Sequence, residues 1–181
     1  PYSDPIIFID ICIFILSRRH TILTSDLSSD VCSSDLARNG AVATSQPLAS
    51  QVGLQILQNG GNAVDAAVAT AAALNVLEPM STGIGGDMFA LIWMADTKKV
   101  SAINGSGRSA MAANPEDILS KGYGSIPTEG KGAAFSVSVP GTVDGWQKCL
   151  DMHGTMTLGE VLQPAIKYAD RKSTRLNSSH W

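Results

Sequence analysis

Charged and aromatic side chains are both scarce in this chain of 181 residues. Asp, Glu, Lys and Arg make up 16% of it and aromatic residues 6%, whereas hydrophobic residues make up 44%. The 13 basic and 16 acidic side chains leave no cationic face, which argues against a nucleic-acid partner or binding to an anionic membrane. The aromatic residues are too few for a surface on which bases stack. The balance is typical of a globular domain with a well-buried core.

Cysteine and histidine are scarce too, with three of each. Neither the number nor the spacing of Cys12, Cys32 and Cys149 indicates a disulfide framework or a zinc site. The histidines are far apart and have no carboxylate or thiol neighbours at ligand spacing. We therefore expect no metal and no cofactor. Cys149 lies beside Leu150 in an amphipathic pattern, which predicts a core thiol and not a nucleophile.

Long apolar runs are also missing. The isoleucine-rich stretch 6–16 is too short to span a bilayer, which requires about 20 apolar residues. In a signal peptide the positive charges precede the apolar run, whereas Arg18 and Arg19 follow it here. We therefore expect no membrane segment in this chain, and its residues leave the compartment unknown.

Both ends differ in composition from the middle. Residues 28–36 and 170–180 resemble translated sequencing-adapter strings, although a natural disordered tail has a similar composition. We therefore expect residues 1–36 to be a non-native or disordered flank and residues 170–181 to be a non-native tail. Residues 37–169 are the part from which a fold can be predicted.

The middle of the chain alternates between helical and strand patterns. Apolar residues recur at helical spacing after Pro47, and the pair Gly60-Gly61 ends that pattern as a helix C-terminal cap does. The patterns predict helices over residues 47–59, 63–77, 115–119, 142–153 and 158–169, and strands over 40–45, 88–94, 100–104 and 136–140. Pro164 is expected to kink or shorten the last helix. Helices that cover a mixed sheet are expected, of class α+β or α/β, and periodicity does not decide between the two.

The first candidate site is a loop that contains Gly83, Gly85 and Gly86. A glycine-rich loop that binds phosphate follows a strand, opens a helix and carries a lysine. This loop follows a helix, leads into a strand and has no lysine, so the pattern disfavours phosphate binding. Two interpretations are left, which are a tight turn where backbone passes close to backbone and a loop that contacts a ligand.

The second candidate is Arg108, which follows a predicted strand among small residues in Asn104-Gly-Ser-Gly-Arg-Ser109. A guanidinium group can hold a carboxylate through two parallel hydrogen bonds. An ordinary surface arginine, or one paired with a structural aspartate, fits the same pattern. No Gly-x-Ser-x-Gly nucleophile motif is present. The residues alone therefore leave the role of Arg108 open.

Six short motifs follow one another along the middle of the chain. They are Gly60-Gly-Asn-Ala-Val-Asp-Ala-Ala67, Glu78-Pro79, Gly83-Ile-Gly-Gly-Asp-Met-Phe89, Asn104-Gly-Ser-Gly-Arg108, Val139-Pro-Gly-Thr-Val143 and His153-Gly-Thr-Met156. In this order they resemble the front part of the large subunit of the gamma-glutamyltranspeptidase family. The resemblance extends from Ala37 to Ala169, and the first motif is its most specific part.

The resemblance implies an N-terminal-nucleophile hydrolase with a layered αββα fold, of which this chain holds an incomplete α+β part. In that family a precursor cuts itself, and the threonine exposed at the start of the small subunit attacks a gamma-glutamyl amide, usually of glutathione. The missing small subunit and a gamma-glutamyl substrate are therefore the implied partners. By position, Arg108 matches the arginine that holds the substrate alpha-carboxylate. Gly83, Gly85 and Gly86 match a loop near the active site.

No catalytic residue is expected in this chain, because its threonines are internal and have no free amine. We therefore expect the isolated chain to be inactive. After Arg108, the sequence Ser109-Ala-Met-Ala departs from the acidic residue and proline of better-known members. Glutathione preference is therefore open, and the alternatives are a related cephalosporin or poly-gamma-glutamyl acylase, or a non-catalytic module that binds a small carboxylate. The resemblance is compatible with a periplasmic or secreted location.

Overall fold

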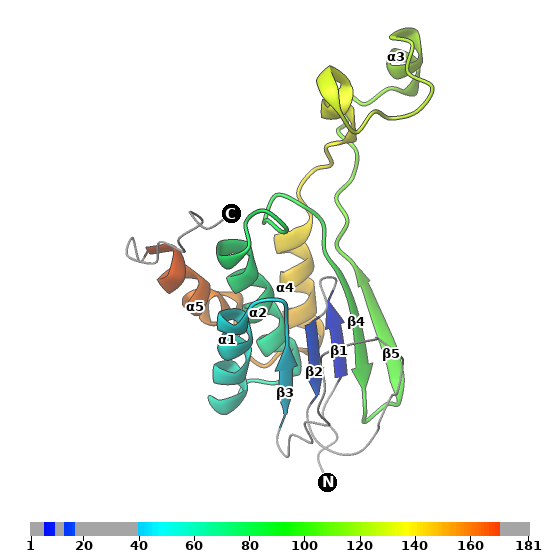
Figure 1. Cartoon of the computed structure of the whole chain (residues 1–181). Helices are drawn as coiled ribbons and strands as arrows, with labels where there is room; N and C mark the ends of the chain where they lie inside the picture. Colours follow the sequence, from blue (N-terminus) through cyan, green and yellow to red (C-terminus); the bar gives the residue numbers. More distant parts are fainter. Residues whose placement is uncertain (1–5, 10–12, 17–39, 171–181) are drawn as a thin grey trace, which may run out of the picture.

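The computed structural model describes residues 6–9, 13–16 and 40–170. The described strands are β1 (Ile6–Ile9), β2 (Ile13–Leu16), β3 (Ala41–Ala43), β4 (Phe89–Met94) and β5 (Lys99–Asn104). They form one five-stranded sheet in the order β3-β2-β1-β4-β5, and every neighbouring pair is antiparallel (Figure 1). Segments far apart in sequence therefore lie side by side in this sheet.

The strands predicted over residues 88–94 and 100–104 are confirmed, and together they form a hairpin. β4 and β5 pair along their whole length, with Phe89 opposite Asn104. At the turn between them, Lys98 has a positive φ of 54°, a left-handed conformation that tight turns commonly require. Arg108 lies just beyond the end of β5, so the hairpin sets where this residue begins.

β1 and β2 form a second hairpin, which lies between β3 and β4. β1 pairs with β4, and β2 pairs with β3. Both strands fall within the predicted flank 1–36, whereas residues 17–39 and the tail from residue 171 onward lie outside the described residues. The pairing does not test whether the flank is foreign to the protein, so that origin stays a prediction.

Four helices lie on one side of the sheet (Figure 1), namely α1 (Pro47–Gln58), α2 (Ala63–Leu77), α4 (Thr142–His153) and α5 (Leu158–Asp170). α1 has Pro47 at its first position, and the Gln46 side chain caps it by accepting the N–H of Leu48. α5 begins with a capping box between Thr157 and Glu160, as its sequence suggests. Pro164 does not shorten α5, because the helix continues through it to Asp170.

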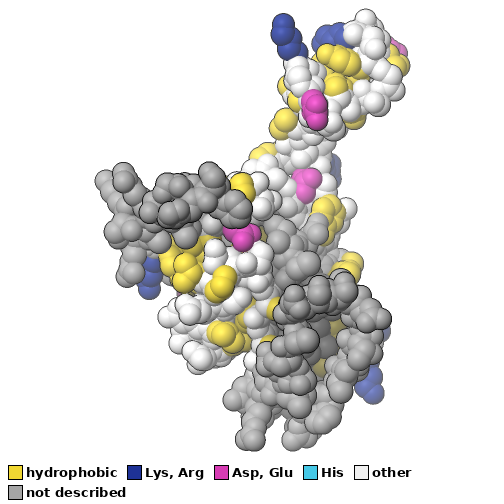
Figure 2. Space-filling view, in the orientation of Figure 1, with side chains coloured by type: hydrophobic (Ala, Val, Ile, Leu, Met, Phe, Trp, Pro, Cys, Tyr) yellow, Lys and Arg dark blue, Asp and Glu magenta, His cyan; other side chains and the backbone are white. Residues whose placement is uncertain are grey.

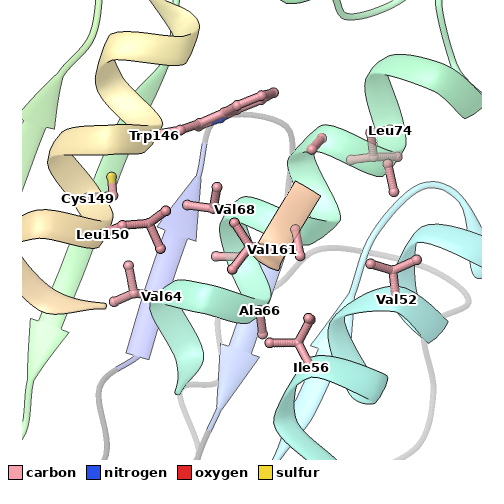
Figure 3. Packing of buried hydrophobic residues seen from close by; sticks show 14 of the residues in the cluster. Val52, Ile56, Val64, Ala66, Val68, Leu74, Trp146, Cys149, Leu150 and Val161 are labelled. Carbon is pink, nitrogen blue, oxygen red and sulfur yellow. The ribbon is translucent and has the colours of Figure 1, made fainter. Parts of the chain in front are cut away.

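The central helix of the core is α2, which packs against α1, α4, α5, β1 and β2. Twelve of its fifteen residues are buried, and alanine predominates among them. These small side chains allow close packing, since a Cβ added at Gly53 of α1 would lie 2.5 Å from Oγ1 of Thr70. Figure 3 shows Val64 and Val68 of α2 together with Leu150 of α4 in this core. Each fully buried side chain of this size contributes about 1.5–3 kcal/mol.

The two faces of the sheet are not equally covered. In β4, Ala90 is 3% and Ile92 0% exposed, and both belong to the core beneath the helices. Phe89 and Leu91 alternate with them and are 42% and 50% exposed. Because alternate residues of a strand point to opposite faces, the helices bury one face of the sheet and leave apolar side chains bare on the other. A second layer is needed to cover that face.

Residues 109–137 form an arm that stands away from the sheet (Figure 1). It contains the helix α3 (Pro115–Ser120) and the 3₁₀ helix η1 (Gly130–Ser136). Its own packing is limited to small contacts, such as the edge-to-face pair of Tyr123 and Phe135, with ring centroids 6.3 Å apart. Figure 2 shows apolar side chains exposed on this arm among basic and acidic ones.

The strand predicted over residues 136–140 is wrong. Ser136 ends the 3₁₀ helix, and residues 137–141 belong to no strand. Val137 is extended, which explains the strand-like pattern, but Pro140 has no N–H to donate to a ladder. The segment instead makes isolated backbone bonds to two neighbouring segments, which bring it beside Arg108.

Candidate substrate-binding site

Arg108 lies four residues beyond β5, where the chain leaves the sheet for the arm. Its side chain is exposed. Across the part of the chain that the structure describes, the one ion pair joins Lys148 and Asp144, so no described acid holds the Arg108 guanidinium. Of the alternatives left open by the sequence, an arginine paired with a structural aspartate finds no support among residues 40–170.

The backbone before Arg108 continues the β4–β5 pairing by one further step. The Gly105 N–H donates to the Met88 carbonyl at 2.7 Å, and the Met88 N–H donates to the Gly105 carbonyl at 3.3 Å. Past this point the backbone pairing stops. The Gly107 N–H donates instead to Oδ1 of Asp87, at 2.8 Å.

A third segment, residues 138–142, packs against the backbone around Asp87 and Arg108. The Val139 N–H donates to the Arg108 carbonyl at 2.8 Å. The Ser138 hydroxyl donates to the same Asp87 oxygen that accepts from Gly107, at 3.1 Å. Two segments far apart in sequence, at Asp87 and at Val139, therefore hold the backbone before and after the Arg108 side chain.

The three segments come so close that only glycine fits at several positions. A Cβ at Gly107 would lie 1.6 Å from the Val139 carbonyl oxygen, and a Cβ at Gly141 would lie 2.2 Å from the Gly105 carbonyl oxygen. Both distances are far below van der Waals contact. These glycines therefore permit a backbone-to-backbone junction that no other residue allows.

The predicted loop with Gly83, Gly85 and Gly86 is a turn, in which the Gly86 N–H donates to the Gly83 carbonyl at 3.2 Å. Of the two interpretations left open for this loop, the one in which backbone passes close to backbone finds no support at Gly83 and Gly85, because a Cβ at either would meet nothing within 4 Å. The loop contributes through its carbonyl group instead. The Gly86 oxygen accepts the N–H groups of Gly141 and Thr142, at 3.0 and 3.1 Å, where α4 begins.

These contacts bring both sequence candidates to one end of the sheet. The glycine loop, the residues before Arg108 and the start of α4 are joined there by hydrogen bonds. Asp87, Gly107 and Gly141, which make this junction, were not among the predicted site residues. The sequence did contain a signal for two of them, an acidic residue directly after a glycine cluster for Asp87 and alternate glycines after a strand for Gly107.

The gamma-glutamyltranspeptidase family model matches residues 49–171, which is more than half of the chain. The chain belongs to this family. The resemblance found in its motifs is thereby confirmed, and Arg108 and the glycine loop both lie within the matched region.

Curated members of the family differ in the activity that their names state. The chain is 45% identical over 91 residues to the glutathione hydrolase-like YwrD proenzyme of Bacillus subtilis, an alignment that covers 50% of this chain and 17% of the relative. It is 43% identical over 99 residues to the acylase ACY 1 proenzyme of Pseudomonas sp. strain V22, covering 52% and 18%. The chain therefore spans under a fifth of the length of these relatives.

Solved structures of the family resemble the fold described above. The gamma-glutamyltranspeptidase of Helicobacter pylori aligns with a TM-score of 0.64 at 36% identity, covering 71% of this chain and 37% of that one. The cephalosporin acylase of Bacillus halodurans aligns with a TM-score of 0.64 at 44% identity, covering 82% and 27%. The predicted fold class, an incomplete part of the αββα fold of N-terminal-nucleophile hydrolases, is confirmed. The bare face of the sheet agrees with an incomplete set of layers.

Other reactive groups of this gamma-glutamyltranspeptidase chain have structural roles. Cys149 lies in the core, where burial raises the pKa of its thiol to about 11, so the thiolate needed for nucleophilic attack is suppressed at neutral pH. His153, at the end of α4, shares a hydrogen bond of 3.2 Å with the Ser101 hydroxyl. The buried Thr70 hydroxyl donates to the Ala66 carbonyl within α2, at 2.6 Å. None of the three lies on the loops around Arg108.

Residues 40–170 hold no group of three His, Cys, Asp or Glu side chains arranged to bind a metal ion. No helix in the described ranges combines the length and the apolar character that crossing a bilayer demands. A pocket between α1 and α5 is lined by Val52, Gln55, Pro164, Lys167 and Tyr168. These helices carry neither Arg108 nor the glycine loop.

Proposed function

We propose that the protein that carries this chain cleaves gamma-glutamyl amides and that Arg108 binds the alpha-carboxylate of the gamma-glutamyl group. The observation that carries this proposal is the state of Arg108 itself. Its side chain is exposed and has no acidic partner among residues 40–170, yet the backbone around it is held by two other segments. A guanidinium that has no acidic partner among residues 40–170, and that stands on a backbone held by two other segments, is suited to binding an anionic group of a ligand.

The chemistry of the side chain supports a carboxylate as that group. The guanidinium offers two parallel N–H donors that match the two oxygens of a carboxylate, whereas the ammonium of a lysine is a single point of charge. A gamma-glutamyl group presents its alpha-carboxylate at one end and the amide to be cleaved at the other. Arg108 therefore fixes the position of the amide without touching it.

The nucleophile is proposed to come from the small subunit of the same precursor. Self-cleavage would expose a threonine whose hydroxyl oxygen attacks the gamma-carbonyl carbon while its own amine accepts the hydroxyl proton. The carbon–nitrogen bond of the amide then breaks, and the leaving amine takes up a proton. Water or an acceptor amine attacks the gamma-glutamyl ester in turn and regenerates the threonine. A gamma-glutamyl amide such as glutathione is the proposed donor.

On this proposal, the chain by itself lacks the nucleophile and is inactive. The carboxylate-binding group lies on the large-subunit side of the site, and the reacting group lies on the other. The exposed loop at Gly83 and Gly85 is proposed to line the active site, since its backbone is open to a neighbouring segment. The small subunit is thus both a partner of the fold and a part of the site.

A second candidate function is that of an acylase for a cephalosporin or a poly-gamma-glutamyl substrate. Two observations favour it, namely the alignment with the cephalosporin acylase over 82% of this chain and the sequence Ser109-Ala-Met-Ala after Arg108. Arg108 serves in either case, because both kinds of donor end in a carboxylate. A non-catalytic module that binds a small carboxylate is the third candidate, and turnover separates it from the other two.

The test uses the full-length protein and two anilides. Gamma-glutamyl p-nitroanilide carries the alpha-carboxylate and alpha-ammonium, whereas glutaryl p-nitroanilide keeps the carboxylate and lacks the ammonium. Arg108→Ala is expected to raise KM for both by about 30- to 900-fold, because loss of a charged bidentate contact costs about 2–4 kcal/mol. Arg108→Lys should recover only part of this loss. Unchanged kinetics in Arg108→Ala would remove this residue from the site.

The ratio of kcat/KM for the two anilides separates the candidates. A preference for the gamma-glutamyl anilide supports the transferase and hydrolase, because only that activity requires recognition of the ammonium group. A preference for the glutaryl anilide supports the acylase. Binding without release of p-nitroaniline supports the non-catalytic module and contradicts both enzymes.

A further inference from the structure

Asp87 makes contacts that the proposed chemistry of Arg108 does not itself require. It lies directly after the glycine loop and before β4. Its Oδ1 accepts two hydrogen bonds, from the Gly107 N–H at 2.8 Å and from the Ser138 hydroxyl at 3.1 Å. One carboxylate oxygen thus links the residue that precedes Arg108 to a segment about thirty residues further along the chain.

The Asp87 carboxylate replaces a backbone hydrogen bond that a regular β4–β5 ladder would make next. Met88 and Gly105 exchange two backbone hydrogen bonds, and in an antiparallel ladder the next such pair would be Gly86 and Gly107. The Gly86 carbonyl is already engaged by the first N–H groups of α4. Gly107 is therefore left without its backbone acceptor, and Asp87 supplies a charged one from its side chain.

The bonds around Arg108 form a closed ring. Asp87 binds Gly107, which precedes Arg108, and the Arg108 carbonyl accepts the N–H of Val139. Ser138, which precedes Val139, closes the ring because its hydroxyl donates to Asp87. Removing the Asp87 carboxylate breaks two bonds of the ring at once, since one oxygen accepts both. The bond from the Val139 N–H to the Arg108 carbonyl is then left to hold the two segments together.

We propose that Asp87 is a positioning residue for Arg108, which sets the place of the guanidinium without contacting the substrate; this inference rests on the proposed function. The guanidinium stands at the end of a long side chain, so a small rotation of the backbone at Gly107 moves it far. A misplacement of about 1 Å in a group that orients a substrate can lower kcat/KM by up to about 100-fold. The close contact of Gly107 with Val139 allows the backbone before Arg108 only a small range of positions.

The test is a mutant cycle in the full-length protein with gamma-glutamyl p-nitroanilide. Asp87→Ala is expected to raise KM about 10-fold and to change kcat much less, because it weakens binding of the group far from the reacting bond. Asp87→Asn keeps an acceptor oxygen for the Gly107 N–H and should restore most of the affinity. Asp96→Ala is the matched control, an exposed aspartate at the opposite end of the same hairpin, and should leave KM unchanged.

The double variant decides between positioning and general damage. If Asp87 acts through Arg108, Asp87→Ala adds nothing to KM once Arg108→Ala is present. Multiplicative effects of the two substitutions, or an Asp87→Ala protein with a lower melting temperature and wild-type KM, would overturn the positioning role while the proposed function stands. An Arg108→Ala protein with unchanged KM would overturn the proposed function, and this inference with it.

Discussion

The carboxylate of Asp65 accepts the hydroxyl of Thr155 at 2.6 Å, a contact between residues ninety positions apart in sequence. The Asp65 side chain is fully buried at the start of α2. Its oxygens also accept the backbone N–H groups of Asn62, Thr155 and Met156. One carboxylate therefore caps α2 and ties the loop between α4 and α5 to that helix.

This arrangement predicts that Asp65→Asn destabilises the protein. The amide would place an N–H₂ group where the carboxylate now accepts from the Asn62 N–H and the Thr155 hydroxyl, so buried donors would face each other. The expected loss is about 2–4 kcal/mol in the free energy of unfolding, measured by urea denaturation of the full-length protein. Thr155→Val removes one hydroxyl only and should cost about 1 kcal/mol. Equal losses for the two variants would contradict the central role of the carboxylate.

A second prediction concerns Gly107. Gly107→Ala puts a methyl group where there is 1.6 Å to the Val139 carbonyl oxygen, so the two backbones must separate. We expect a loss of about 1–3 kcal/mol in stability and a raised KM for gamma-glutamyl anilides. Gly159→Ala is the matched control, because a Cβ at this α5 position meets nothing within 4 Å. It should raise the melting temperature, since alanine favours helix.

Local sequence patterns were enough for most elements of this fold. The helices α1, α2, α4 and α5 and the β4–β5 hairpin agree with their predicted spans, because capping residues, glycine pairs and apolar periods are local signals. The strand predicted over residues 136–140 failed for the opposite reason. Whether this segment forms a strand depends on whether a neighbouring strand offers it unpaired backbone groups. The residues that it does bind, Gly86 and Arg108, are far away in sequence.

The candidate site was predictable only in part. Arg108 was found through its residue type and its place in a motif, but its lack of an acidic partner among residues 40–170 is a three-dimensional property. Asp87 was missed because its importance lies in two hydrogen bonds to segments twenty and fifty-one residues away. The sequence also did not indicate which glycines are crowded by other backbone, since the crowding at Gly107 comes from Val139 and not from its neighbours in sequence.

A third prediction follows from the buried thiol of Cys149. Its pKa is raised from 9.0 to about 11 by desolvation, so at pH 8 the thiolate fraction should be about 100-fold lower than in an unfolded chain. Iodoacetamide should therefore modify Cys149 at least that much more slowly in the folded protein than in urea. Peptide mapping by mass spectrometry measures the rate at this residue alone. Similar rates in the two states would contradict the burial.

The same shift gives a pH dependence of stability. The unfolded chain loses the thiol proton near pH 9, and the folded protein keeps it until about pH 11. The stabilising contribution is therefore complete below pH 9 and is lost as the pH rises through 11. Between pH 8 and pH 11 the wild-type protein should lose more stability than Cys149→Ala, as measured by urea denaturation. A parallel loss in the two proteins would show that Cys149 does not contribute.

The last prediction concerns the β1–β2 hairpin, which fills the space between β3 and β4 although its residues fall in a flank predicted to be non-native. Within the described residues, β3 has no other strand partner than β2. If the flank is foreign, we expect other strands to occupy this space in the native protein. Deleting residues 1–36 from the full-length protein should then change its melting temperature by less than about 2 °C, the smallest shift that a loss of about 1 kcal/mol causes in a domain of roughly 150–250 residues.

The matched experiment deletes the same residues from the chain of 181 residues alone. There β3 loses its described partner and the edge of β4 is uncovered, so limited proteolysis should cut the shortened chain faster than the complete one. The flank is thus expected to matter in the isolated chain and not in the full-length protein. If the full-length protein also loses stability or gamma-glutamyl anilide turnover without residues 1–36, the hairpin is a native part of the sheet and the composition of the flank is misleading.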